Sequence, residues 1–293
     1  MPVALAIISQ YRFEAGGSRE RTAQWAALRL LLSVFGIAGC AAWPGSSDPG
    51  AGLGGWSREG IPAGPFELQS YTRPGVTAVK QLHIYLHGDG RAFLRPGTVS
   101  RDPTPRESLT ARLAAADPAP TVFLARPCYF GTHTDPGCAS RYWTVERYGP
   151  TVVNAVAVAV EQIAARHPGA QVTLIGYSGG GVVALLAARQ AASVSSVITI
   201  AAPLDTGRWS ELHGYTPLAP GSNPAKLTHW RTDLRQVHLW GDSDSVVPPE
   251  VNRSFLHGSG PQRESVETHE FRDFDHLCCW AESWGSILSR IGA

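Results

Sequence analysis

Continuously apolar segments alternate with segments of helical character along most of this chain. Short runs of Val, Ile, Leu and aromatic residues end at turns rich in glycine and aspartate, which is typical of buried strands. Between them, apolar residues recur at helical spacing, and several of these segments open with proline. The pattern predicts strands within 65–73, 79–90, 121–128, 170–178, 193–203 and 234–242, and helices within 105–118, 149–169, 179–191 and 281–292.

Most of the predicted strands are apolar throughout and do not alternate between apolar and polar positions. Such strands are buried on both faces, as in a parallel sheet with helices on each side. The sequence therefore predicts one α/β domain over 62–293, with a doubly wound, mostly parallel sheet. Ligands of such sheets bind at the carboxyl ends of the strands, so we expect a site at the turns HGDG, GYSGG, IAAPLD and GDSD.

Residues 28–40 form a short apolar run that ends in Ile-Ala-Gly-Cys and resembles a bacterial lipobox. The run is too short for a membrane-spanning helix of about 20 residues, but it fits the apolar region of a secretory signal. A tract rich in Gly, Pro and Ser follows, with the composition of a flexible tether. We expect residues 1–40 to be an extension with a lipoprotein-type signal, lipidated at Cys40, and residues 41–61 to be the tether. The alternative is a buried helix that happens to end in Gly-Cys.

The net charge and the cysteine content limit which ligands and binding partners the sequence predicts. The formal net charge of +1 gives no global field that would attract nucleic acid. No cysteine or histidine cluster has zinc-ligand spacing, so we expect no metal and no cofactor. Export would put the cysteines in an oxidising compartment, where Cys128 and Cys138 flank a polar turn suited to disulfide closure. Cys278 and Cys279 are neighbours that either remain thiols or form a bridge.

Residues 176–180, GYSGG, fit the pattern G-x-S-x-G between a predicted strand and a predicted helix. In a nucleophile elbow the serine takes a strained backbone conformation, and close packing of strand and helix requires glycines around it. The rival interpretation is a phosphate-binding turn, but the segment lacks the spacing G-x-G-x-x-G and has no P-loop lysine. We therefore predict that Ser178 is a nucleophile.

A serine nucleophile needs a general base and a carboxylate that orients the base. In this arrangement the acid and then the histidine follow the serine along the chain. Asp244, just before Val-Val-Pro, is the predicted acid, and Asp242 is the rival that shapes the turn. His276, ahead of the last predicted helix, is the predicted base, and His269 and His257 are the alternatives.

The transition state of acyl transfer also needs hydrogen-bond donors for its oxyanion. We expect one donor to be the backbone N–H of Gly179, directly after the predicted nucleophile. The other is expected in the turn HGDG, with the main chain of Asp89 as the donor and His87 bracing the turn. A carboxylate aimed at an oxyanion would oppose catalysis, so the Asp89 side chain should turn away and bond to a nearby backbone group or to an arginine such as Arg91 or Arg95.

Together, HGDG, GYSGG, GDSDSVVP and FDH resemble the α/β-hydrolase superfamily over essentially all of the chain beyond the tether. The stretch LARPCYFGTHTDPGC and the segments 141–149 and 203–224 resemble a group of poorly characterised bacterial hydrolases, often lipoproteins. The resemblance implies an α/β-hydrolase fold acting on esters, thioesters, amides or lactones. We expect Tyr177, Trp143 and Trp209 to contact substrate; the alternative is that the aromatic segments merely pack over the sheet edge.

These features predict a serine hydrolase that cleaves an uncharged carboxylic ester, or a related acyl bond, through an acyl-enzyme. A small acyl compound is the expected substrate, and a lipid on Cys40 is the expected contact with a membrane of the bacterial cell envelope. The alternative is a non-catalytic protein of the same fold with a binding or structural role in the envelope. The order Ser, Asp, His together with an oxyanion turn favours the enzyme.

Overall fold

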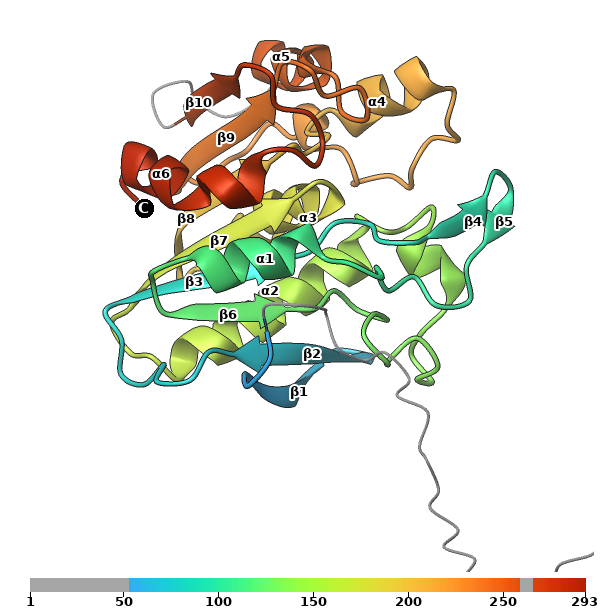
Figure 1. Cartoon of the computed structure of the whole chain (residues 1–293). Coiled ribbons are helices and arrows are strands. Elements are labelled where there is room, and N and C mark those ends of the chain that lie inside the picture. The colour runs from blue at the N-terminus through green and yellow to red at the C-terminus, as the bar shows by residue number, and fades with distance from the viewer. Residues whose placement is uncertain (1–52, 259–265) are drawn as a thin grey trace, which may run out of the picture. The chain divides into compact units, whose positions relative to one another are not determined.

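The computed structural model describes residues 53–258 and 266–293, and its main element is an eight-stranded sheet (Figure 1). In sheet order the strands are β1 (Ser57–Ala63), β2 (Phe66–Thr72), β6 (Thr121–Leu124), β3 (Gln81–Leu86), β7 (Gln171–Tyr177), β8 (Val194–Ile200), β9 (Arg235–Gly241) and β10 (Val266–Phe271). The pairings β1–β2 and β2–β6 are antiparallel, and those from β6 across to β10 are parallel. The predicted mostly parallel sheet in a single α/β domain is confirmed.

Helices cover both faces of this sheet (Figure 1). They are α1 (Leu109–Ala116), α2 (Pro150–Ala165), α3 (Gly179–Ala188), α4 (Thr206–His213), α5 (Pro249–His257) and α6 (Trp280–Ile291). Helix α1 packs against α6, and α2 packs against α3, so each pair forms one covering layer. Helices α4 and α5, which follow β8 and β9, pack against each other. The remaining elements are the hairpin β4–β5 (Phe93–Arg95, Thr98–Val99) and short 3₁₀ turns at Ser140–Trp143 and Pro224–Lys226.

The four helices predicted from the sequence are present as α1, α2, α3 and α6. Local chemistry accounts for two of their starts: the Ser108 hydroxyl accepts the N–H of Ala111 at the cap of α1, and Pro150 occupies the first turn of α2. The first strand begins at Ser57, so the segment predicted as a tether up to residue 61 overlaps β1. Helices α4 and α5 and strand β10 were not predicted.

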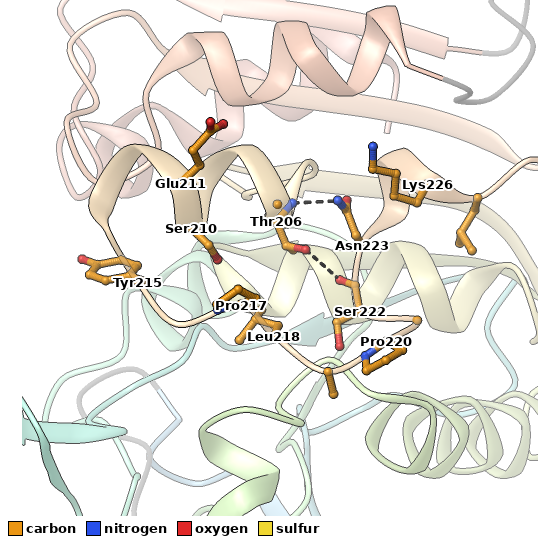
Figure 2. Close-up of a pocket in the computed structure, with 14 residues that line it drawn as sticks. Thr206, Ser210, Glu211, Tyr215, Pro217, Leu218, Pro220, Ser222, Asn223 and Lys226 are labelled. Carbon is orange, nitrogen blue, oxygen red and sulfur yellow. Dashed lines mark hydrogen bonds between the residues drawn. The ribbon is translucent and has the colours of Figure 1, made fainter.

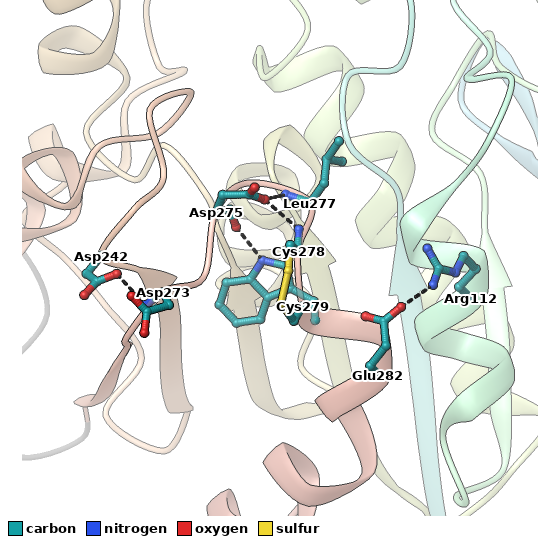
Figure 3. Close-up of a disulfide and its surroundings, with 9 residues drawn as sticks. Arg112, Asp242, Asp273, Asp275, Leu277, Cys278, Cys279 and Glu282 are labelled. Atoms are coloured by element: carbon teal, nitrogen blue, oxygen red, sulfur yellow. Dashed lines mark hydrogen bonds and ion pairs between the residues drawn. A yellow bond between two sulfur atoms is a disulfide. The ribbon is translucent and has the colours of Figure 1, made fainter.

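Two disulfides join cysteines of the described residues. Cys128 is joined to Cys138, with their Cα atoms 5.6 Å apart, as expected for the polar turn between them. Cys278 is joined to its neighbour Cys279, just before α6 (Figure 3). In the described part of the chain, no helix is long and apolar enough to cross a membrane. Cys40 and the predicted signal lie outside the described residues.

Candidate active site

Ser178 lies at a sharp turn between the end of β7 and the start of α3. Its backbone has φ 52° and ψ −129°, a positive-φ conformation that is costly for a residue with a side chain. The turn is held by the Ser178 N–H, which donates to the Ile200 carbonyl at 2.8 Å. A side chain at Gly176 would collide with the Gly180 backbone, and one at Gly180 would collide with the His87 carbonyl. The glycines around Ser178 are therefore required by the close packing of β7, α3 and the turn after β3.

The serine hydroxyl stands at one end of a chain of hydrogen bonds. Ser178 Oγ is 3.1 Å from His276 Nε2, and His276 Nδ1 is 2.8 Å from Asp244 Oδ2. The other oxygen of Asp244 accepts the backbone N–H groups of Val246 and Val247, both at 2.8 Å. Asp244 is only 3% exposed, so its carboxylate is held rigidly by the turn that follows β9. The three residues predicted to form a triad are thus brought into hydrogen-bonding reach of one another.

The rival acid and base lie elsewhere. The Asp242 carboxylate accepts the backbone N–H of Asp273 and the hydroxyl of Ser243, so it shapes the turn beside Asp244. His269 lies in the edge strand β10, where it contacts Glu267. His257 ends α5 and is exposed.

The loop that carries His276 is held on both sides. The Tyr177 hydroxyl donates to the His276 carbonyl at 2.8 Å, and the two rings lie 5.2 Å apart. Asp275 accepts the backbone N–H groups of Leu277 and Cys278, which leads the chain into α6 (Figure 3). Tyr177, expected to contact substrate, therefore also fixes the position of His276.

The turn after β3 lies directly against the start of α3. A side chain at Gly179 would collide with the Asp89 carboxylate and the Tyr148 hydroxyl, and one at Gly88 would press on the Ser178 side chain. His87 donates from Nδ1 to the Gly88 carbonyl at 2.7 Å and accepts the backbone N–H of Arg126 at Nε2. Burial, helped by nearby Arg126, lowers the pKa of His87 to about 3, so the ring is neutral and braces the turn as expected.

The Asp89 carboxylate is turned toward two arginines. It lies 2.7 Å from Arg126 Nη1 and 3.2 Å from Arg147 Nε, and it accepts the Tyr148 hydroxyl at 2.6 Å. Burial by itself raises the pKa of Asp89, but Arg147 and Arg126 lower it below its usual value, so the carboxyl is ionised. One carboxylate against two guanidinium groups leaves one net positive charge beside Gly179. An arginine was one of the two kinds of partner expected for the Asp89 carboxylate, but the arginines that it meets are not Arg91 and Arg95.

A pocket of about 460 Å³ opens at Ser178. Its lining comes from the turn after β3, the segment before α1, the elbow, α4, the acid loop and the histidine loop: His87, Gly88, Asp89, Gly90, Arg91, Pro105, Arg106, Glu107, Ser108, Leu109, Thr110, Tyr177, Ser178, Trp209, Val246, His276 and Leu277. Tyr177 and Trp209 line it as expected. Trp143 does not: its indole N–H donates to the Ser100 carbonyl and its side chain is buried away from the pocket.

Figure 2 shows a larger pocket of about 650 Å³ between α4 and the segment 215–227. Tyr215, Leu218 and Lys226 are among its lining residues, and none of the triad residues is. The smaller pocket is therefore the candidate active site, because it alone contains the strained serine. Within 53–258 and 266–293, no cluster of His, Cys, Asp and Glu side chains could hold a metal ion.

No protein-family model matches this sequence, and no curated protein is similar to it in sequence. Solved structures are similar in fold. An alpha-beta serine hydrolase homologue from Coxiella burnetii is 18% identical with a TM-score of 0.55, over 81% of this chain and 97% of that chain. An esterase from Pyrococcus furiosus is 14% identical with a TM-score of 0.56, over 81% and 89% of the two chains. A serine hydrolase without a lid from Xanthomonas campestris is 16% identical with a TM-score of 0.51, over 80% and 94%. The fold of this protein is that of the α/β hydrolases.

Proposed function

We propose that this protein is a serine hydrolase that cleaves a carboxylic ester, or a related acyl bond, through an acyl-enzyme. The observation that carries the proposal is the hydrogen-bonded chain from Ser178 through His276 to Asp244, which begins at a strained serine in an open pocket. A binding or structural role in the cell envelope would need neither the strained backbone nor an aligned histidine.

The first half of the reaction transfers the acyl group to the enzyme. His276 Nε2 takes the hydroxyl proton of Ser178 as Oγ attacks the carbonyl carbon of the ester. Asp244 accepts the Nδ1–H of His276, which fixes the ring tautomer and stabilises the imidazolium. The proton then passes from Nε2 to the departing alkoxide, so an alcohol leaves and the acyl group stays on Oγ.

The tetrahedral intermediate carries a negative oxygen, which the backbone N–H groups of Gly179 and Asp89 receive. The Asp89 carboxylate does not oppose this charge, because Arg126 and Arg147 more than neutralise it. The cluster's single net positive charge lies in a largely buried environment, where electrostatic interactions are stronger than in water. It therefore favours the oxyanion over the neutral ester.

The second half of the reaction releases the acid. Water enters the pocket at Ser178, and His276 Nε2 removes one of its protons as the oxygen attacks the acyl carbon. Collapse of the second tetrahedral intermediate breaks the bond to Oγ, and the proton on Nε2 returns to Ser178. The products are a carboxylic acid and the free enzyme, and no other reactant is needed.

A fluorophosphonate probe tests this function directly, because it bonds only to an activated serine. The purified protein should be labelled at Ser178, and it should hydrolyse 4-nitrophenyl butyrate. Ser178→Ala should abolish both the labelling and the hydrolysis. The matched control is Ser243→Ala, which changes an exposed serine bonded to Asp242 and should retain both. An unlabelled wild-type protein, or a fully active Ser178→Ala variant, would leave the fold without this function.

We propose further that the protein is held at a membrane of the bacterial cell envelope by lipid on Cys40, with residues 1–39 removed. The short apolar run ending in Ile-Ala-Gly-Cys and the Gly-, Pro- and Ser-rich tract after it support this proposal. Intact mass of the protein expressed in a bacterium and extracted from its membranes should show a diacylated product that begins at Cys40. A soluble product that retains residues 1–39 would contradict the anchor.

A further inference from the structure

The pocket at Ser178 contains charged side chains that the proposed chemistry does not use. Arg91 and Arg106 line it, and in the described part of the chain neither guanidinium group has an ion pair or a hydrogen bond. Arg91 is half-buried, whereas Arg106 is exposed. Most other arginines near the pocket are satisfied, as Arg126 and Arg147 are by Asp89. Two unpaired arginines in one pocket point to a negative partner that comes from outside the chain.

The charge balance indicates a partner with a single negative charge. Glu107 is the only other lining residue with an unpaired charge, and it offsets one of the two arginines. The remaining excess is one positive charge among these three groups. The Asp89 cluster adds a second positive charge deeper in the pocket, but that charge lies beside Gly179, where the oxyanion forms.

The wall that holds Arg106 has polar groups with spare hydrogen-bonding capacity. It continues into the first turn of α1, so the positive end of this helix faces the pocket. Thr110, in the same turn, lines the pocket, and its buried hydroxyl has no hydrogen-bond partner within the described residues. Both features act in the same direction as the arginines.

We propose that the substrate carries a carboxylate group in addition to its scissile ester, and that Arg91 and Arg106 bind this carboxylate. An arginine suits the role because its planar fork donates two parallel hydrogen bonds to a carboxylate. The inference rests on the proposed hydrolase function and names its substrate class. It goes beyond the uncharged ester expected from the sequence.

Two pairs of esters test the proposal, with the charge on opposite sides of the scissile bond. In the first pair the acyl group differs: mono-4-nitrophenyl glutarate is compared with its primary amide. In the second pair the leaving group differs: 4-acetoxybenzoate is compared with 4-acetoxybenzamide. In at least one pair, kcat/KM for the anion should exceed that for the amide by about tenfold, and the excess should shrink in strong salt. An anion that is cleaved no faster than its amide in both pairs would overturn the proposal.

Variants then assign the preference to the two arginines. The ratio of kcat/KM for anion and amide is measured within each variant, so any loss of folded enzyme cancels. Arg91→Gln and Arg106→Gln should each reduce this ratio, and the double variant should bring it close to one. Glu107→Gln should raise it. Arg95→Gln is the matched control, because Arg95 lies in β4 outside the pocket lining and bonds to Thr98.

The outcomes separate this inference from the proposed function. If the wild type cleaves the ester bond of the two neutral, amide-bearing substrates and Ser178→Ala does not, the proposed function stands. It then stands whatever the ratio of kcat/KM for anion and amide is. A ratio that stays unchanged in the Arg91→Gln, Arg106→Gln double variant would then reject the carboxylate site alone. If Ser178→Ala still cleaves the ester bond of the amide-bearing substrates, the proposed function itself is rejected.

Discussion

Among the described residues, two hydrogen-bonded histidine–aspartate pairs have similar geometry in different surroundings. His276 Nδ1 lies 2.8 Å from Asp244 Oδ2 in the pocket at the carboxyl edge of the sheet. His83 Nδ1 lies 2.6 Å from Asp117 Oδ2 within the core. The first histidine is on a loop before α6, and the second is in β3. Comparing them shows which features support the catalytic role proposed for the first pair.

The two pairs differ in the groups that lie next to the second ring nitrogen of the histidine and next to the carboxylate. His276 Nε2 faces Ser178 in an open pocket, and the histidine side chain is 14% exposed. His83 is fully buried, and its Nε2 faces the Gln81 amide at 3.0 Å.

Asp117, the carboxylate of the buried pair, is hydrogen-bonded to further side chains of the core. Asp117 accepts the Tyr85 hydroxyl in addition to His83, and the same hydroxyl accepts the indole N–H of Trp284 in α6. These contacts tie β3 to the helices above it and leave no group free to react. The catalytic role proposed for His276 and Asp244 therefore depends on a fold that leaves one ring nitrogen facing a nucleophile and solvent.

The largest contrast is expected when each histidine is removed. His276→Ala should lower kcat for 4-nitrophenyl butyrate by about 10⁶-fold, because the base and the nucleophile act as a unit, and it should leave the folded structure intact. His83→Ala should lower the free energy of unfolding and leave kcat per folded molecule nearly unchanged. Steady-state kinetics and urea unfolding of both variants measure this. A comparable loss of kcat in His83→Ala would erase the distinction between the two pairs.

Replacing Asp244, the carboxylate of the pair at the pocket, is expected to have the next largest effect. Asp244→Asn should lower kcat by about 10⁴-fold with little loss of structure. The amide oxygen would keep the N–H groups of Val246 and Val247, so the amide NH2 would face His276 and donate to Nδ1, which holds the ring in the wrong tautomer. Asp242→Asn, two residues earlier in the same turn, is the matched control and should retain most activity. Equal losses in both variants would mean that the acid has been misassigned.

Replacing Asp117, the carboxylate of the buried pair, should lower the stability of the fold and leave the rate of hydrolysis unchanged. Asp117→Ala leaves the His83 ring, the Tyr85 hydroxyl and the Ala119 N–H without their acceptor. The free energy of unfolding should fall by roughly 3–5 kcal/mol, measured by urea denaturation at pH 7. If this variant does not fold, the smaller change Asp117→Asn should show the same direction. The control Asp233→Ala changes a surface carboxylate and should have little effect. Unchanged stability in Asp117→Asn would contradict the role of this pair.

The smallest effect is expected when a buried histidine that has no carboxylate partner is replaced, and it concerns the pH dependence of stability. His238 in β9 contacts Thr199, and burial lowers its pKa from 6.5 to about 3. The unfolded chain therefore binds a proton that the folded chain does not, and stability falls as the pH decreases from 6.5 toward 3. His238→Gln should make this acid-induced loss shallower, as measured by urea unfolding at pH 7, 6, 5 and 4. His257→Gln, which changes an exposed histidine, should leave the slope as in the wild type. The same slope in both variants would mean that His238 is not buried as a neutral base.

Sequence patterns succeeded where the signal is local. The long apolar runs predicted the central strands, and the helices that flank them follow from their period and their prolines. The glycines around Ser178 predicted the elbow, because close packing there excludes any Cβ. Strand β10 was missed since VETHEF is a half-exposed edge strand with charged residues, and it has no apolar run. Helix α4 was missed because only Trp209 among its larger apolar residues is buried.

The sequence by itself determined the central strands of the sheet, the elbow and the order of Ser178, Asp244 and His276, since each is encoded in a short segment with a characteristic pattern. Only the tertiary structure decided which charges meet. Arg126 follows β6 and Arg147 precedes α2, yet both reach the Asp89 carboxylate, in place of the nearer Arg91 and Arg95. The parallel sheet produces this outcome because it brings the ends of distant strands to one edge, and burial then leaves an ionised carboxylate stable only beside the cations it finds there.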